Sequence, residues 1–243
     1  MAHRWLASLL VLFAIVLVAS VPRAQPPAAN GGKLGKGGDL ELVEKLITMR
    51  KDYQKTLEQL RAHYVQANDL QRAKWAEDEL VSFHRAPKHA FILDLFVPPP
   101  NLNGQTNVTE ANKLFTQAMG YKDIGFGTTY IDNQRRAEIL FQEILTRYPQ
   151  SDKISDVAFM LGDIYESKAY RQFYLAAEYY QRCCQWNTKT THEARMRAAR
   201  IYDRQLNNRS KAIELYKEVT THETDQRRIQ EAQKRLAELS TSR

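Results

Sequence analysis

Cysteine is nearly absent from this sequence of 243 residues, and its scarcity limits how the chain can be stabilised. The two cysteines present, Cys183 and Cys184, are neighbours. Adjacent residues on a helix point in different directions, so a disulfide between them would be strained. We expect both to pack inside a helical core, with an intermolecular disulfide as the minor alternative. Stability must then come from packed helices.

Recognisable catalytic and metal-binding motifs are also lacking. The sequence holds no motif that pairs a nucleophile with a base, no pair of carboxylates typical of a catalytic pocket and no ligands at metal spacing. His84 and His89 are five residues apart and flank Pro87. They do not share a helix face as metal ligands would, and we expect both at the surface. We therefore predict a protein that is not an enzyme and that uses no metal or other cofactor.

Long blocks of one charge are missing as well. The chain has 35 Lys and Arg against 28 Asp and Glu, a formal net charge of +7, but both signs alternate along the predicted helices. Mixed charge of this kind is typical of a solvated helix face. Because no basic block is interleaved with aromatic residues, we expect no nucleic-acid partner.

The start of the chain differs from the rest. A basic head containing Arg4 precedes an uncharged apolar run over residues 5–21. This pattern predicts a secretory signal peptide or an uncleaved membrane anchor over residues 1–24. Residues 25–38 are rich in proline and glycine and predict a disordered linker. We expect an exported protein that contacts a membrane only through this N-terminal segment, and only if the segment is retained.

Residues 39–86 carry two helical patterns. Apolar side chains recur every three or four residues from Val43 to Ala67, and Asn68-Asp69 then interrupts the pattern and can cap a second helix. We predict an antiparallel helical hairpin packed within the molecule, or a coiled coil that joins two copies of the chain. Both interpretations fit the same pattern.

A Pro-rich connector follows over residues 87–108. Its residues 91–97 alternate as a strand-like strip that we expect to lie along a helical surface, and the triple proline at 98–100 cannot enter a helix. Farther along, glycines interrupt a helix and leave a loop over residues 121–130 that contains three aromatic residues. We expect these aromatics to pack over the end of a helical array, with a part in binding as the alternative.

Residues 109–243 contain an internal repeat. An alanine followed four residues later by an aromatic residue recurs at spacings of 39 and 36 residues, and a second signature that ends in tyrosine recurs after 37 residues. Two alternating signatures imply two helices per repeat, stacked in an array. We predict an all-α protein in which a helix over residues 224–239 caps the array. The structural signature comprises Ala137, Phe141, Pro149, Leu161, Gly162, Tyr165, Ala176, Tyr180, Ala198, Ala199, Tyr202, Ala212 and Tyr216.

Residues 136–151 and 157–165 resemble a tetratricopeptide repeat (TPR). Their Tyr-Pro-x-Ser turn and the following Leu-Gly-x-x-Tyr resemble in particular the subgroup of bacterial envelope proteins that includes the Tol-Pal-associated periplasmic protein and the outer-membrane assembly lipoprotein of the BamD type. The resemblance implies a right-handed α-solenoid of two to three degenerate repeats after the hairpin. It also implies a location in the periplasm or cell envelope, possible outer-membrane association included.

The sequence departs from the TPR pattern at several positions. Ala158 and Arg195 stand where the motif often has tryptophan, and Thr188 and Thr224 stand where later prolines would fall. No cysteine lies near the end of the apolar N-terminal run, which argues against a direct counterpart of the assembly lipoprotein. The resemblance covers roughly residues 110–240 and leaves the hairpin unassigned.

In arrays of this type the first helix of each pair lines the concave surface. The resemblance therefore implies a candidate partner-binding groove among the residues of those helices that lie outside the packing signature. Its apolar members, Phe159 and Met196, are the best reason to expect a groove, while the alternative is a charged, solvated face without a partner. The groove residues are Phe159, Asp163, Glu166, Met196, Arg200, Asp203 and Arg204.

These patterns favour a non-catalytic scaffold of the cell envelope that binds a partner protein through the groove. The first alternative is a structural coiled-coil tether that self-associates through the hairpin. A binder of cell-wall or surface polymers comes last, because the sequence has no ladder of aromatic residues for sugars. Neither the identity of the partner nor the cellular process follows from the residues.

Overall fold

The computed structural model describes residues 39–86 and 88–241. These residues are all-α, as predicted, and their only strand-like pairing is a single bridge between Thr106 and Ser151. The predicted signal peptide or anchor (1–24) and linker (25–38) lie outside the described residues. The helices are α1 (Asp39–Gln66), α2 (Leu70–Arg85), a 3-10 helix (Leu93–Leu95), α3 (Thr109–Met119), α4 (Gly127–Arg147), α5 (Ile154–Glu166), α6 (Phe173–Trp186), α7 (Ala194–Arg204), α8 (Arg209–His222) and α9 (Gln226–Thr241).

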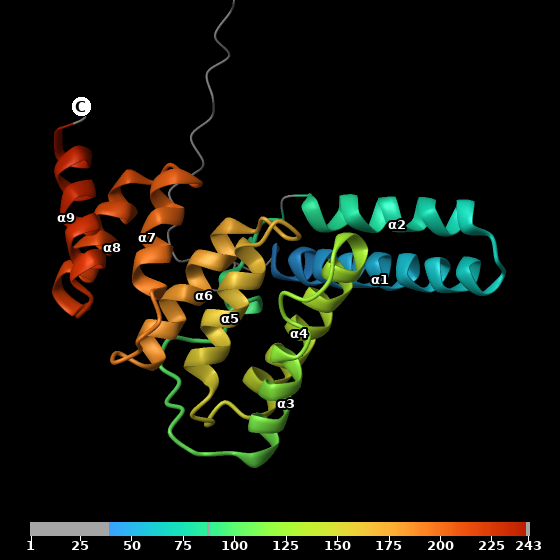
Figure 1. Ribbon diagram of the computed structural model, residues 1–243, viewed down its shortest axis with the longest axis horizontal. Helices are drawn as coiled ribbons and strands as arrows, with labels where there is room; N and C mark the ends of the chain where they lie inside the picture. Colours follow the sequence, from blue (N-terminus) through green and yellow to red (C-terminus); the bar gives the residue numbers. More distant parts are fainter. Residues whose placement is uncertain (1–38, 87, 242–243) are drawn as a thin grey trace, which may run out of the picture.

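The first two helices form an antiparallel pair that projects from one end of the molecule, while α9 lies at the other end (Figure 1). Asn68 adopts a left-handed conformation with a φ of 55°, which asparagine tolerates better than most residues. Asp69 then caps α2, since its side chain accepts a hydrogen bond from the backbone N–H of Arg72 at 3.0 Å. The hairpin buries one apolar stripe, whose members are Val43, Leu57, Ala73, Ala76 and Leu80.

The connector does not form the strand-like strip expected over residues 91–97. It turns through the 3-10 helix at Leu93–Leu95 instead, because no neighbouring strand in the described part of the chain offers backbone groups for an extended strip to pair with. The connector does lie along a helix, as expected. Side chains of α6 donate three hydrogen bonds to its carbonyl oxygens: Tyr179 Oη to Phe96 at 2.8 Å, Arg182 Nε to Pro98 at 2.8 Å and Trp186 Nε1 to Pro99 at 3.0 Å.

From α3 to α9, each helix packs mainly against the helices immediately before and after it. Cys183 and Cys184 are unpaired and buried in α6, as predicted. Pro149 follows the end of α4 at Arg147, and α9 packs on α8 at the end of the row. The buried members of the predicted signature are Ala137, Phe141, Leu161, Gly162, Tyr165, Ala176, Tyr180, Ala198, Ala199, Tyr202, Ala212 and Tyr216.

Gly162 determines how closely α5 and α6 approach each other. A Cβ atom at this position would lie 2.6 Å from two ring carbons of Tyr180, a distance at which one of the two must move. The aromatic ring therefore fills the space that any side chain at residue 162 would need. The absence of a side chain at Gly162 is what permits this close packing of α5 on α6.

Candidate functional site

The seven predicted groove residues do not share one surface. Asp163, Glu166 and Arg200 line a cavity of about 860 Å³. Arg204 is exposed and is not among the residues that line this cavity. Phe159 is half-buried, and its ring stacks on that of His192 with 4.2 Å between the centroids. The structure thus brings three of the predicted residues together.

The prediction is wrong for two of the seven residues, Met196 and Asp203. Met196 is fully buried, because α7 lies between α6 and α8 and is covered on both sides. The side chain of Asp203 is only 4% exposed, since Arg235 binds it through Nε at 2.6 Å and Nη2 at 3.0 Å, and Tyr216 donates to it at 3.1 Å. Neither side chain is available to a partner.

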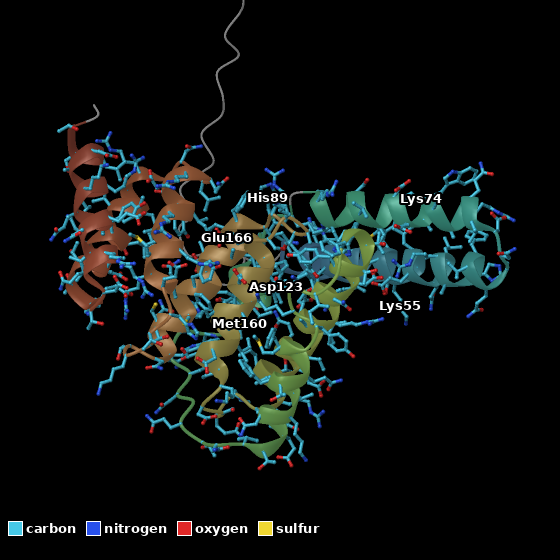
Figure 2. The ribbon with its side chains drawn as sticks, viewed as in Figure 1. Lys55, Lys74, His89, Asp123, Met160 and Glu166 are labelled. Atoms are coloured by element: carbon cyan, nitrogen blue, oxygen red, sulfur yellow. The ribbon has the colours of Figure 1, made fainter. Side chains whose placement is uncertain are left out.

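The cavity lies where the α3–α4 loop, the C-terminal end of α5 and one face of α7 meet. Figure 2 labels Asp123, which comes from the loop, and Glu166, which comes from the end of α5. Phe126 from the loop and Arg85 from the end of α2 extend the lining. Charged groups of both signs therefore surround an open hollow whose volume is in the range of ligand sites.

Arg197 is the centre of a charge network on one wall of this cavity. Lys122, whose side chain is buried, also forms ion pairs with Asp163 and Asp123. The network joins α7 to α5 and to the α3–α4 loop. The guanidinium of Arg197 contacts Asp163 at 2.5 Å, Glu193 at 2.8 Å, Glu166 at 3.3 Å and the hydroxyl of Tyr180 at 2.9 Å.

Asp163 and Tyr180 in this network keep their charge states near neutral pH. Burial acts to raise the pKa of Asp163, but hydrogen bonds and charges from Lys122 and Arg197 outweigh it and hold that pKa below its ordinary value. Burial raises the pKa of the Tyr180 hydroxyl far above its usual value, and the charge of Glu166 adds to the effect. The wall therefore offers permanent charges and hydrogen bonds, which suit recognition better than proton transfer.

The loop before α4 presents an aromatic side chain to solvent. Gly125 and Gly127 have φ values of 95° and 59°, which glycine adopts without strain, and Phe126 between them is 94% exposed. The expectation that the loop aromatics pack over the helices is wrong for Phe126, whereas Tyr121 and Tyr130 do pack on the core. The loop is also shorter than expected, since α4 already begins at Gly127.

Sequence reasoning missed Lys122 and Arg197 as members of a site, and it gave the loop that contains Phe126 a part in binding only as an alternative. Arg197 follows Asp163 by 34 residues, which is close to the length of one repeat. Opposite charges spaced by one repeat were therefore the sequence signal that could have identified Arg197. The glycines on both sides of Phe126 were a visible sign of an exposed loop tip. Lys122 carries no such signal, because its partner Asp163 is 41 residues away and no repeat relates the two.

The structure also bears on the predicted positions of two histidines and on candidate metal sites and membrane spans. His84 is buried, at 3% exposure, against the ring of Tyr170, which corrects its predicted surface position, while His89 is exposed. Over residues 39–86 and 88–241, no three His, Cys, Asp or Glu side chains are grouped to hold a metal ion. Within the same ranges, no helix has the length and hydropathy that a membrane span requires.

No family model, curated protein or solved structure matches the chain.

Proposed function

We propose that this protein is a non-catalytic, protein-binding scaffold of the cell envelope, built on a TPR-like α-solenoid of two to three degenerate repeats. The observation that carries the proposal is the cavity beside Phe126, where an exposed aromatic ring adjoins fixed charges of both signs. Aromatic and arginine side chains are the groups most enriched at the energetic centres of protein interfaces. The surface around Phe126 and Arg197 is accordingly the partner site.

The architecture and the N-terminus support the remaining parts of the proposal. Helices that pack mainly on their neighbours in the chain are typical of repeat arrays, in which each unit contacts only the next. The close contact of Gly162 with Tyr180 matches the role of the small residue in the TPR signature. The apolar run at residues 5–21 supports export to the envelope.

The unpaired charges at the rim suggest the chemistry of the partner. The carboxylates of Asp163, Glu166 and Glu193 are all engaged by Arg197. Arg85 and Lys168 are exposed lining residues with no carboxylate partner in the described part of the chain. A partner segment with an apolar side chain for Phe126 and acidic side chains for this rim fits the site.

Site-specific crosslinking in the native host tests the proposal. A photoreactive residue placed at position 168 should form crosslinks to another protein, identified by mass spectrometry. Phe126→Ser should lower the yield of these crosslinks at least about tenfold, because the ring supplies the apolar anchor. Phe91→Ser is the matched control, since Phe91 is also exposed but does not line the cavity. Equal yields in both variants would contradict the proposal.

A coiled-coil tether is a second candidate, and one observation favours it. Of the twelve large hydrophobic side chains that are exposed among the described residues, seven lie on the hairpin, which leaves an apolar surface that a second copy would cover. A photoreactive residue in place of Trp75 should then crosslink two copies of the chain. These exposed residues are Leu42, Met49, Tyr53, Leu60, Val65, Leu70 and Trp75.

A further inference from the structure

A second cavity, of about 510 Å³, lies at the junction of the hairpin with the connector and the row of helices. Its walls come from α1, α2, the connector, α4, α5 and the start of α6. A volume of this size is typical of sites that take a small organic molecule. The cavity shares no lining residue with the one beside Phe126, so it is a separate site.

The lining of this cavity is strongly cationic. Arg50, Lys51, Lys88 and Arg135 line it, and Glu138 is the one carboxylate among its lining residues. That carboxylate is already fully engaged. It accepts hydrogen bonds from Arg135 at 2.9 Å, from the Tyr165 hydroxyl at 2.8 Å and from the Tyr170 hydroxyl at 2.6 Å.

Three cations at this site therefore have no ion-pair partner within the described part of the chain. Arg50 and Lys51 form no ion pair with any residue in the described ranges, and neither does Lys88. Lys88 instead donates to the carbonyl oxygens of Phe83 and Ala86, and its ammonium lies 4.2 Å from the centroid of the Phe83 ring. Carbonyl groups and an aromatic face reduce the cost of this half-buried charge but do not neutralise it.

The electrostatics reflect this excess of positive charge. Burial and, to a smaller extent, the charge of Arg50 lower the pKa of Lys88 to about 8, against the opposing effect of the Glu138 charge. Burial also lowers the pKa of Arg50. Keeping these side chains charged inside the cavity costs free energy. An anion held among them would offset that cost through charge-assisted hydrogen bonds.

Apolar side chains make up much of the remaining lining, beside the polar Gln54, His84, His89, Gln142, Thr146 and Gln172. The rings of Phe83, Phe96, Tyr165 and Tyr170 line the cavity together with Ile47, Ile139 and Leu175. A fully hydrated inorganic anion would leave these surfaces without a partner. An anion with an apolar body would cover them and gain the free energy of burying apolar area.

We propose that this cavity binds a small amphipathic organic anion. Its acidic group lies among Arg50, Lys51 and Lys88, and its apolar body lies against the aromatic wall. The ligand contacts both the hairpin and the row of helices. This site is independent of the proposed partner site at Phe126.

Fluorescence titration of the full chain tests the proposal with two dyes that share one body. The anionic probe is 8-anilinonaphthalene-1-sulfonate, and the uncharged probe is N-phenyl-1-naphthylamine. At pH 7 we expect the anionic dye to bind saturably, one molecule per chain, and at least about tenfold more tightly than the uncharged dye. Decanoate should displace it by competition. Equal affinity for the two dyes would overturn the proposal.

Variants locate the site. Arg50→Gln with Lys88→Gln should weaken binding of the anionic dye at least about tenfold and leave the uncharged dye unaffected. Lys55→Gln with Lys74→Gln is the matched control, since it removes the same charge from exposed positions of the hairpin (Figure 2). If the first variant fails to fold by circular dichroism, Arg50→Gln with Lys51→Gln replaces it, because both changes lie on α1. Unchanged binding in the folded variant would refute the site.

One competitor distinguishes a small ligand from a protein segment. A hexaglutamate peptide carries many carboxylates but no apolar body, and we expect it not to displace the anionic dye. Displacement by the peptide and not by decanoate would assign the cavity to an acidic protein partner and overturn the proposal.

Discussion

The hairpin and the row of helices are both amphipathic, but they bury very different shares of their residues. In α1, three of 28 residues are buried, whereas in α6 ten of 14 are buried. The difference follows from the number of neighbours, since α1 packs chiefly on α2 while α6 lies between α5 and α7 with the connector against it. A periodic apolar stripe thus produces a core only where elements cover it from more than one side.

The largest expected effect measures this contrast directly. Phe141 is fully buried, with its ring 5.6 Å from that of Phe115 on α3, and Phe141→Ala should lower the free energy of unfolding by about 3–5 kcal/mol. Trp75 on the hairpin is 60% exposed, and Trp75→Ala should change the free energy of unfolding by no more than about 0.5 kcal/mol. Urea denaturation followed by circular dichroism measures both. Similar losses would mean that the hairpin has a covered core of its own.

Two histidines, one in each region, should give stability opposite pH dependences. Burial lowers the pKa of His84 in the hairpin to about 4, below the ordinary 6.5, so protons bind the unfolded chain more strongly. Its contribution, about 3 kcal/mol, is complete above pH 6.5 and lost as pH falls toward 4. A hydrogen bond to Asp156 raises the pKa of His192, so its contribution is present below pH 6.5 and lost as pH rises through the folded-state pKa.

Single variants separate the two histidines. His84→Gln should flatten the decline in unfolding free energy between pH 6.5 and 4.5, whereas His192→Gln should remove the loss on the alkaline side. The acid measurement stops at 4.5 because Glu138 also loses stabilising charge at lower pH. For that carboxyl, burial acts to raise the pKa, but Arg135 and two tyrosine hydroxyls hold it below the ordinary value. A decline that persists in His84→Gln would contradict the assignment.

The smallest effect concerns the ion pair that joins the two regions. Arg61 on α1 and Asp132 on α4 are 2.9 Å apart, with side chains 23% and 29% exposed. A double-mutant cycle with Arg61→Gln and Asp132→Asn should give a coupling energy of about 0.2–1 kcal/mol that decreases with added salt. A coupling above about 2 kcal/mol would show that the hairpin is held to the row far more tightly than its exposure indicates.

The helices and their packing residues were predictable because their signals are local. Alanine four residues before an aromatic ring places both on one helix face, and each such pair, including Ala176 with Tyr180, is buried as expected. The break at Asn68 and the cap at Asp69 are likewise chemistry of adjacent residues. Periodicity and capping residues were therefore enough to predict most of the helices and their buried faces.

The site was less predictable because its contacts join distant residues. Met196 occupies a helix face that is covered from both α6 and α8, and one helix's pattern does not reveal how many neighbours it will have. His84 became buried for the same reason, through contact with Tyr170 on the far side of the connector. The cationic cavity likewise depends on the placement of the hairpin against α4, which no motif encodes.

The way α6 holds the connector has a consequence for how this protein changes over evolutionary time. Tyr179, Arg182 and Trp186 donate to carbonyl oxygens, and every residue type supplies a carbonyl oxygen. For these contacts the three donors must be kept, whereas the acceptor residues Phe96, Pro98 and Pro99 can change as long as the path of the backbone is kept. The buried side chains of Ile92 and Val97 constrain the connector separately through packing. Distant descendants of this chain should share the three donors of α6 more often than the residue types that supply the three carbonyl oxygens.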